Sequence, residues 1–270
     1  MKISVEIGAK NYQADMNKPL DITIPVDFSG SGLTAFGAPA ASSVAYAAGD
    51  YIGDVQQGGS CNCEVLTFAP HLHGTHTECV GHISHERICI ADVFKGGISA
   101  ATLITMQPVT PMQTDETYAI DCAVDDALIT KEKLQNLIKN NQFLESLIIR
   151  TSPNKTAKIS GEYSTNMPAF FTTQAMEFIV ELGVKNLLID TPSVDRLDDE
   201  GKLSNHHIFW NITQGSHQVD AVNPSPKTIT ELIYVADEIA DGNYLLDLQV
   251  AALMMDAAPS HPILYEVTEI

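Results

Sequence analysis

The sequence predicts a single α/β domain over residues 1–270, with a mixed β-sheet and packed helices on its outer face. Helix and strand signals alternate in the middle of the chain, which is typical of β-α-β units. Residues 19–28 alternate apolar and polar side chains with the period of two that indicates a half-buried strand. The composition, 44% hydrophobic and 18% charged, provides for a sizeable core.

The N-terminal half is expected to supply strands and one long loop. The strand at 19–28 is followed over 29–43 by a stretch rich in Gly, Ser, Pro and Ala. Irregular segments of this kind often reach over a pocket, and Phe36 within it is a candidate aromatic wall or packing anchor. Further strands are predicted over residues 63–68, 102–109 and 118–124.

The C-terminal half carries the β-α-β signal. Thr130 is the predicted N-cap of a helix that extends to Lys139. Thr172 or Thr173 caps a second helix, which Gly183 ends. Buried strands are predicted over 147–149 and 186–190, a surface loop over 211–226, and further strands over 244–255 and 262–267.

The charge of the chain excludes several classes of partner. The net charge is −19 and the pI near 4.6, which argues against nucleic acid and anionic membranes. No apolar run reaches the roughly 18 residues needed to span a bilayer, and residues 1–10 carry no signal-peptide core. The odd number of cysteines, five, fits reduced thiols. We therefore expect a cytoplasmic protein that acts on a small-molecule substrate.

Residues 71–82 predict a metal site. Their sequence, His-Leu-His-Gly-Thr-His-Thr-Glu-Cys-Val-Gly-His, places four imidazoles and one carboxylate in a single short segment. These groups are ligands of Zn²⁺, Mn²⁺ and Fe²⁺, whereas a solvated loop does not need them. Gly74 and Gly81 interrupt any helix, and a predicted strand precedes the segment. We expect the site on a loop at a strand end.

Two distant segments are candidates to complete this site. His206 and His207 form a second imidazole pair, and Glu231 lies in an apolar stretch where burial without a partner would be costly. Asp220 and Glu238 are weaker alternatives to Glu231. If these groups converge, they can hold two divalent ions. Such a site favours hydrolysis by metal-activated water, with a histidine that moves the proton.

The pattern Pro70-His71-x-x-Gly74-Thr75-His76-x-Glu78-x-x-x-His82 resembles the H-x-G-T-H-x-D-x-P-x-H signature of the cyclase family, which includes bacterial kynurenine formamidase and isatin hydrolase. Residues 189–195, Ile-Asp-Thr-Pro-Ser-Val-Asp, and the following Leu203-x-x-His206-His207 also resemble that family. The resemblance implies a cyclase-like fold of the swivelling β/β/α type. It also implies a homodimer or higher homo-oligomer and hydrolysis of a C–N bond other than a peptide bond, as in an arylformamidase.

The resemblance implies roles for individual residues. A divalent metal, Zn or Mn with one or two ions per chain, would be held by His71, His76, Glu78, His206 and Glu231. His82 matches the catalytic proton donor and acceptor of the family. Phe36 matches its substrate-side aromatic, and His73 is a further candidate to line the substrate site.

The chain departs from the family pattern at three positions. One extra residue precedes Gly74, so His71 and His73 compete as first ligand; His71 is preferred because it keeps the Pro-His junction. Val80 replaces the family Pro, and Glu78 replaces Asp. The extra methylene moves the carboxylate by about one C–C bond length, against metal-ligand tolerances of about 0.2 Å. The sequence therefore does not decide whether the bond that is cleaved belongs to a formamide, a cyclic amide, or an ester or lactone.

Two other hypotheses about function compete with a metal hydrolase. Cys79 could act as a nucleophile with His82 as its base, although no third orienting residue is evident. Alternatively, the chain is a non-catalytic metal- or ligand-binding protein on the same scaffold, in which Glu78 has ended the chemistry.

Overall fold

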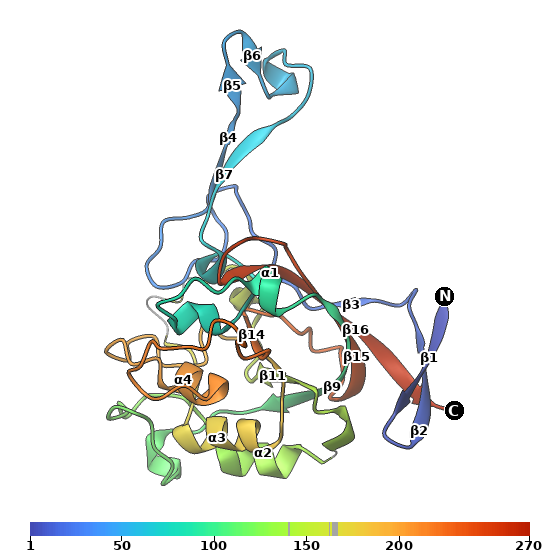
Figure 1. Cartoon of the computed structure of the whole chain (residues 1–270), viewed down its shortest axis with the longest axis vertical. Helices are drawn as coiled ribbons and strands as arrows, with labels where there is room; N and C mark the ends of the chain where they lie inside the picture. The colour runs from blue at the N-terminus through green and yellow to red at the C-terminus, as the bar shows by residue number, and fades with distance from the viewer. Residues whose placement is uncertain (140, 162, 164–166) are drawn as a thin grey trace.

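The computed structural model describes residues 1–139, 141–161, 163 and 167–270. Its main element is a mixed sheet in the order β1-β2-β16-β15-β9-β11-β13-β14-β8, and β16 also pairs with β8. This extra pairing closes the strands from β16 round to β8 into a barrel-like arrangement (Figure 1). The strands are β1 (Lys2–Ile7), β2 (Lys10–Asp15), β8 (His76–Glu78), β9 (Gly97–Met106), β11 (Ser146–Thr151), β13 (Asn186–Ile189), β14 (Thr228–Glu231), β15 (Gly242–Val250) and β16 (Ala257–Glu269), with β3 (Leu20–Asp21) beside β16.

The central strands are buried on both faces. In β11, Leu147 and Ile149 belong to the cluster that packs under the helices, whereas Ile148 belongs to the cluster inside the barrel-like sheet. β9, β11, β13 and β14 run parallel to one another. Parallel strands covered on both faces are expected to be continuously apolar, as the runs at 147–149 and 186–189 are. The predicted mixed α/β fold is confirmed.

Helices cover the outer face of these strands, with α2 and α3 side by side below β9 and β11 in Figure 1. α2 (Lys131–Leu137) begins at Thr130, whose hydroxyl accepts a hydrogen bond from Lys133 N. α3 (Thr173–Glu181) begins at Thr172, which accepts from Ala175 N in the same way. Both predicted caps are confirmed. α4 (Ser204–Trp210) and the short α1 (Ile90–Val93) complete the helices, and no helix among the described residues has the length and apolar character needed to cross a membrane.

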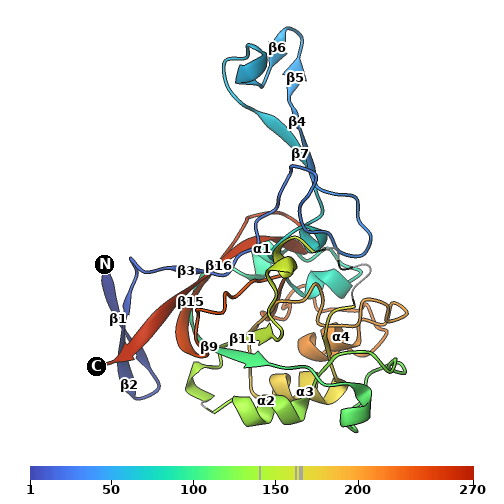
Figure 2. The same cartoon turned by 180° about the vertical axis from the view of Figure 1, so that it is seen from behind.

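A β-ribbon extends away from the body of the molecule (Figures 1 and 2). It is formed by β4 (Ser42–Ala45) paired with β7 (Glu64–Thr67), and its tip by β5 (Ala47–Ala48) and β6 (Tyr51–Ile52). The predicted strand at 63–68 is thus present, but it lies outside the main sheet. Several large apolar side chains on the ribbon are exposed: Val44, Tyr46, Tyr51, Val55, Val65 and Leu66.

Other predicted strands differ from the structure. No strand forms over 118–124; Tyr118 is buried, and its hydroxyl donates to Asp195. The strand expected over 19–28 keeps its alternation, with Ile22 and Ile24 buried, but only Leu20–Asp21 and a bridge at Thr23 pair with neighbours. The loops over 29–41 and 211–226 are observed.

Candidate metal centre

The short strand β8 places His76 and Glu78 on one face of the sheet, because side chains two residues apart on a strand point the same way. In the antiparallel pairing with β14, Glu231 lies directly opposite His76. Residues directly opposite in such a pair share a face, and His76 Nε2 lies 3.4 Å from Glu231 Oε2. The pairing of β8 with β14 therefore brings together His76 and Glu231, two predicted ligands that lie far apart in the sequence.

Gly74 and Thr75 hold β8 in place. Thr75 N donates to Ile24 O at 2.9 Å, and the Thr75 hydroxyl accepts from Ile24 N and donates to Leu232 O. A Cβ on Gly74 would lie 2.8 Å from Ile24 O, too close for any other residue without a shift of the backbone. The Gly-Thr of the motif is therefore structural: it joins the histidine segment to the loop before Phe36 and to the chain after Glu231.

His71 faces the site and His73 does not. His71 Nδ1 lies 3.2 Å from Glu78 Oε2, while His71 Nε2 lies 2.8 Å from Asp256 Oδ2. His73 is directed at backbone carbonyls instead, with Nε2 2.8 Å from Pro39 O and Nδ1 3.1 Å from Ala69 O. The prediction that His73 lines the substrate site is wrong. The segment forms a 3₁₀ turn over Pro70–Leu72 rather than an extended strand, so the two rings point in different directions.

His206 reaches the site from the first turn of α4. Asp195 accepts hydrogen bonds from Asn205 N and His206 N at the start of this helix and lies 2.6 Å from His206 Nδ1. A carboxylate on one ring nitrogen fixes the tautomer and directs the other nitrogen outward. His206 Nε2 accordingly lies 3.0 Å from Glu78 Oε1. His207, its neighbour, lies beside His217 instead.

His82 lies on the rim of the site, and Asp256 contacts it. Asp256 Oδ2 is 3.3 Å from His82 Nδ1 and 2.8 Å from His71 Nε2, so one carboxylate oxygen contacts both rings. The His71 and His82 rings lie 4.3 Å apart. Asp256 was not predicted as a site residue. The one local signal was an acidic residue that interrupts an apolar run just before β16.

The remaining sequence candidates are separated by the structure. Glu231 is buried beside His76, and its Oε1 accepts a hydrogen bond from Val194 N at 2.9 Å. Asp220 and Glu238 are exposed on loops, so they are excluded as substitutes for Glu231. Phe36 is 49% exposed and lines a cavity of about 340 Å³ together with His71, His82, His206 and Glu231. The cavity thus opens directly onto the converging groups.

The burial of Cys79 argues against a thiol nucleophile. Its side chain has no exposed surface, and its thiol donates to Ile88 O at 3.6 Å. Burial, together with the neighbouring carboxylates of Glu78 and Asp256, raises the pKa of Cys79 to about 12. A thiol that stays protonated at neutral pH is a poor nucleophile. Cys79 is a core residue beneath the site.

Carboxylates and imidazoles alternate through the site and shift one another's pKa. Burial alone would lower the pKa of His71, but its hydrogen bonds to Asp256 and Glu78 outweigh this and raise the pKa to about 10. For His206 the charge of Glu78 and the bond to Asp195 outweigh burial and raise its pKa well above the usual value. The charges of His82 and His206 likewise outweigh burial for Glu78 and hold its pKa well below the usual range.

The donor atoms fit a divalent metal ion. His76 Nε2, His206 Nε2 and both carboxylate oxygens of Glu78 are buried and have no hydrogen bond of acceptable geometry within the described part of the chain. Two groups of ligand atoms, one from His71, His76 and Glu78 and the other from Glu78, His82 and His206, each lie within 4.8 Å of one another. Buried polar atoms without partners are costly, and a shared cation would satisfy all four.

Metal affinity should rise with pH. Neutral pH lies below the raised pKa values of His71 and His206. Without a metal, both rings therefore carry a proton that an ion must displace. Each displaced proton should change the apparent affinity by about tenfold per pH unit below those pKa values. Titration calorimetry in buffers of different ionisation enthalpy should detect proton release. Affinity that is constant between pH 6 and pH 8 (about a hundredfold change is expected for one proton) would contradict this.

Comparisons with known proteins identify the family of the chain. The model of a family described as "Putative cyclase" matches residues 14–196. A kynurenine formamidase of Bacillus cereus is 27% identical over 210 residues, which cover 77% of this chain and 82% of that protein. The kynurenine formamidase of Bordetella avium is 24% identical over 208 residues, covering 76% and 81%.

Solved structures share the fold at low identity. Isatin hydrolase A from Labrenzia aggregata superposes with a TM-score of 0.58 at 13% identity, over 92% of this chain and 93% of that one. A structure described as a predicted metal-dependent hydrolase from Bacillus stearothermophilus gives 0.57 at 15% identity, over 92% and 98%. With the family match extending from the second strand to the Asp195 that orients His206, the chain belongs to the cyclase family.

Proposed function

We propose that this protein is a metal-dependent hydrolase that cleaves a C–N bond of a formamide or cyclic amide, or an ester bond, in a small molecule. The observation that carries the proposal is the convergence of buried ligand atoms from His76, Glu78 and His206, which have no hydrogen bond of acceptable geometry within the described residues, beneath a cavity rimmed by His82. Membership of the cyclase family and the kynurenine formamidases among the relatives support it. The same atoms support zinc or manganese as the metal.

The residues present would hold the ion and prepare it for hydrolysis. His71, His76, Glu78, His206 and Glu231 are the proposed ligands, and Asp195 fixes the tautomer of His206. A divalent ion held there would polarise a carbonyl group and lower the pKa of a water molecule. Gly74 O lies 3.0 Å from His76 Nδ1, which places that ring proton on Nδ1 and leaves Nε2 free as a ligand.

His82 is the proposed proton shuttle. Its Nδ1 faces Asp256, while Nε2 has no hydrogen bond or ion pair to any described residue and the ring lines the cavity. A carboxylate on Nδ1 keeps the ring proton there and leaves Nε2 as the basic atom. Nε2 can therefore take a proton from the attacking water and return it to the leaving nitrogen or oxygen. Phe36 would pack against the substrate body.

We expect Asp256→Asn to impair the shuttle without emptying the site. An asparagine keeps the shape of Asp256 but offers Nδ1 of His82 an amide that can donate, which favours the wrong tautomer. At saturating metal, the expected result is a fall in kcat of about 10- to 100-fold with little change in KM. Because the same carboxylate oxygen also contacts the proposed ligand His71, metal affinity should weaken as well. Steady-state kinetics and metal analysis by mass spectrometry measure both. Asp220→Asn, an exposed carboxylate on the loop after α4, is the matched control. Unchanged kcat in Asp256→Asn would remove this role.

The substrate can be tested directly. Metal stoichiometry is measured first by mass spectrometry, and hydrolysis is then assayed with N-formyl-kynurenine, isatin and small lactones. Turnover of one of these that is lost on chelation and restored by zinc or manganese supports the hydrolase. Bound metal without turnover of any of them favours the alternative, a metal- or ligand-binding protein on the same scaffold. Turnover that persists in metal-free protein would overturn the mechanism.

We also propose that the chain forms a homodimer or higher homo-oligomer through the ribbon of residues 42–67. An isolated two-stranded ribbon is only marginally stable in water, and this one exposes 64% of Val44 and 48% of Val65, which lie directly opposite each other on one face. Contact with a second copy would cover these side chains. Light scattering after size-exclusion chromatography should show a smaller particle for Val44→Lys/Val65→Lys; a wild-type monomer would refute the proposal.

A further inference from the structure

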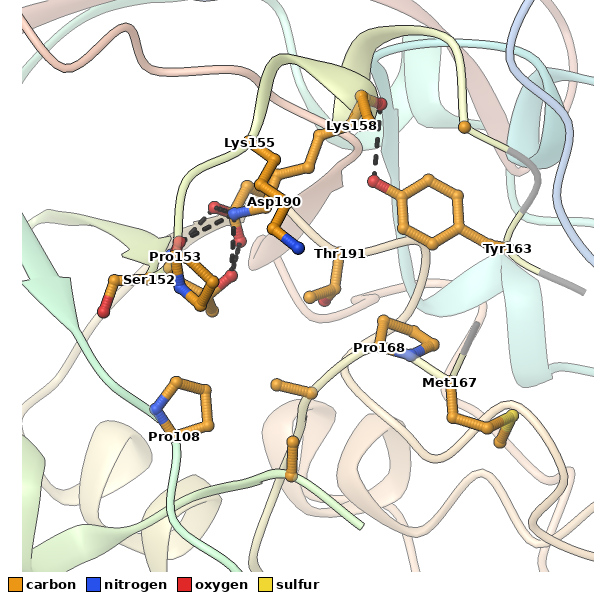
Figure 3. Close-up of a pocket in the computed structure, with 15 residues that line it drawn as sticks. Pro108, Ser152, Pro153, Lys155, Lys158, Tyr163, Met167, Pro168, Asp190 and Thr191 are labelled. Atoms are coloured by element: carbon orange, nitrogen blue, oxygen red, sulfur yellow. Dashed lines mark hydrogen bonds and ion pairs between the residues drawn. The ribbon is translucent and has the colours of Figure 1, made fainter. Parts of the chain in front are cut away.

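A second cavity, larger than the metal cavity, opens at the carboxyl ends of three adjacent parallel strands. It has a volume of about 470 Å³ and is lined by residues that follow β9, β11 and β13, among them Pro108, Pro153 and Thr191 (Figure 3). In open α/β sheets, ligands bind in the crevice outside the carboxyl ends of the strands. This cavity lies at the same kind of strand edge, although the sheet here is closed by the pairing of β16 with β8, so the lining has to carry the argument for a ligand.

The cavity adjoins the metal site but is separate from it. Thr191 lines this cavity, while the next residue, Pro192, lines the metal cavity. Consecutive Cα atoms are about 3.8 Å apart, so the two cavities share a thin wall. On the other side, Tyr163 N donates to Thr34 O, two residues before Phe36. A ligand here would lie beside the reaction without contacting the proposed metal ligands.

The polar groups at the base of the cavity already satisfy one another. Lys158 Nζ lies 2.7 Å from Asp190 Oδ2, and Asp190 also accepts hydrogen bonds from Thr151 N and the Thr151 hydroxyl. Figure 3 shows Lys158 directed back to Asp190. This ion pair is charge-neutral and buried, so it shapes the floor without attracting a ligand of either sign.

Lys155 is the charged lining residue that has no ion pair within the part of the chain that the structure describes. Its side chain points into the cavity in Figure 3, and no hydrogen bond or ion pair of its Nζ is present within the described residues. Among the described lining residues, Lys155 and Lys158 against Asp190 leave one excess positive charge, in a chain whose net charge is −19. Around this ammonium the lining is mainly apolar, with Pro108, Pro153, Pro168 and Met167. An ammonium above apolar walls fits a ligand with one anionic end and an apolar body.

We propose that this cavity binds a small organic carboxylate, with the carboxylate on Lys155 Nζ and the apolar body against the prolines and Met167. The carboxylate could come from two sources: the acid released by hydrolysis in the neighbouring site, or an unrelated acid. The binding itself does not depend on the proposed hydrolase function.

Benzoate and its neutral counterpart benzamide test the proposal by titration calorimetry on the metal-containing protein. We expect benzoate to bind with a Kd of about 1 mM and benzamide at least about tenfold more weakly, because one charge-assisted hydrogen bond is lost. Lys155→Met should weaken benzoate binding by about tenfold or more, whereas Lys133→Met, the same change on an exposed face of α2, should not. Ala157→Trp should block the cavity for both compounds.

The metal site is a competing location for benzoate and is monitored separately. Trp210, the one tryptophan of the chain, has its ring 5.5 Å from that of His206, so its fluorescence reports on the metal cavity. Benzoate binding that survives in Lys155→Met and quenches Trp210 would overturn the proposal, as would no binding at all. If the acid released by hydrolysis competes with benzoate, and the competition is lost in Lys155→Met, the ligand of this cavity is the product of the neighbouring site. If only other acids compete, the ligand is an unrelated acid.

Discussion

Replacing Glu78 with glutamine is expected to remove the metal and abolish turnover. Both carboxylate oxygens of Glu78 are buried, and His71, His82 and His206 surround them at 3.2, 3.8 and 3.0 Å. An amide is a neutral and weak ligand, and its NH₂ group would face imidazole nitrogens that need to bind the ion. Metal affinity should fall by at least about 100-fold, and activity with it. Mass spectrometry of the purified variant and a metal titration measure the change.

Two further variants make this result interpretable. Glu86→Gln makes the same chemical change on an exposed residue of the following loop and should leave metal and activity unchanged. Glu78→Asp restores the family residue and should retain metal, with altered affinity because the carboxylate retreats by about one C–C bond length. Circular dichroism verifies that each variant is folded. A folded Glu78→Gln protein with full metal content would exclude Glu78 as a ligand.

His82→Gln is expected to separate proton transfer from metal binding. The side chain is 27% exposed on the cavity rim and contacts Asp256, so its loss should remove a general acid–base while the buried ligands remain. General acid–base groups typically contribute 10²–10⁴-fold, and kcat should fall by about this factor with KM and metal content nearly unchanged. Steady-state kinetics at several pH values, combined with metal analysis, measures the split.

His85→Gln is the matched control, since His85 is exposed three residues further along and stacks on His217 rather than in the site. It should retain wild-type kinetics. Because His82 also lies within 4.8 Å of ligand atoms of Glu78 and His206, a parallel loss of metal in His82→Gln would show that it is a ligand instead. Full activity in the variant would exclude both roles.

Local sequence patterns predicted those parts of the fold that depend on neighbouring residues. Thr130 and Thr172 cap their helices as expected, because an N-cap bonds to an amide only a few residues away. The apolar run at 147–149 became a central strand because burial on both faces requires continuous hydrophobicity. The strand expected at 118–124 is absent, and Tyr118 instead bonds through its side chain to Asp195, which lies far along the chain.

The metal centre likewise depends partly on local sequence and partly on contacts between distant residues. The sequence by itself determined the ligand chemistry, but it predicted a loop where the structure forms β8, whose period of two places His76 and Glu78 on one face. The sequence favoured His71 over His73 through its Pro-His junction, and the structure shows why the two differ: the 3₁₀ turn directs His71 to Glu78 and His73 to Pro39 O. The spacing of the motif alone does not specify which of the two rings faces the site.

In the structure, residues 71–82 also contact a distant residue that no motif predicted. Asp256 lies 185 residues from His71 and 174 from His82, and it reaches them because β16 closes the sheet against β8. The cavity beside Lys155 likewise exists because β9, β11 and β13 end at one edge. Contacts across such separations depend on how strands are ordered in space, which the spacing of residues along the chain does not specify.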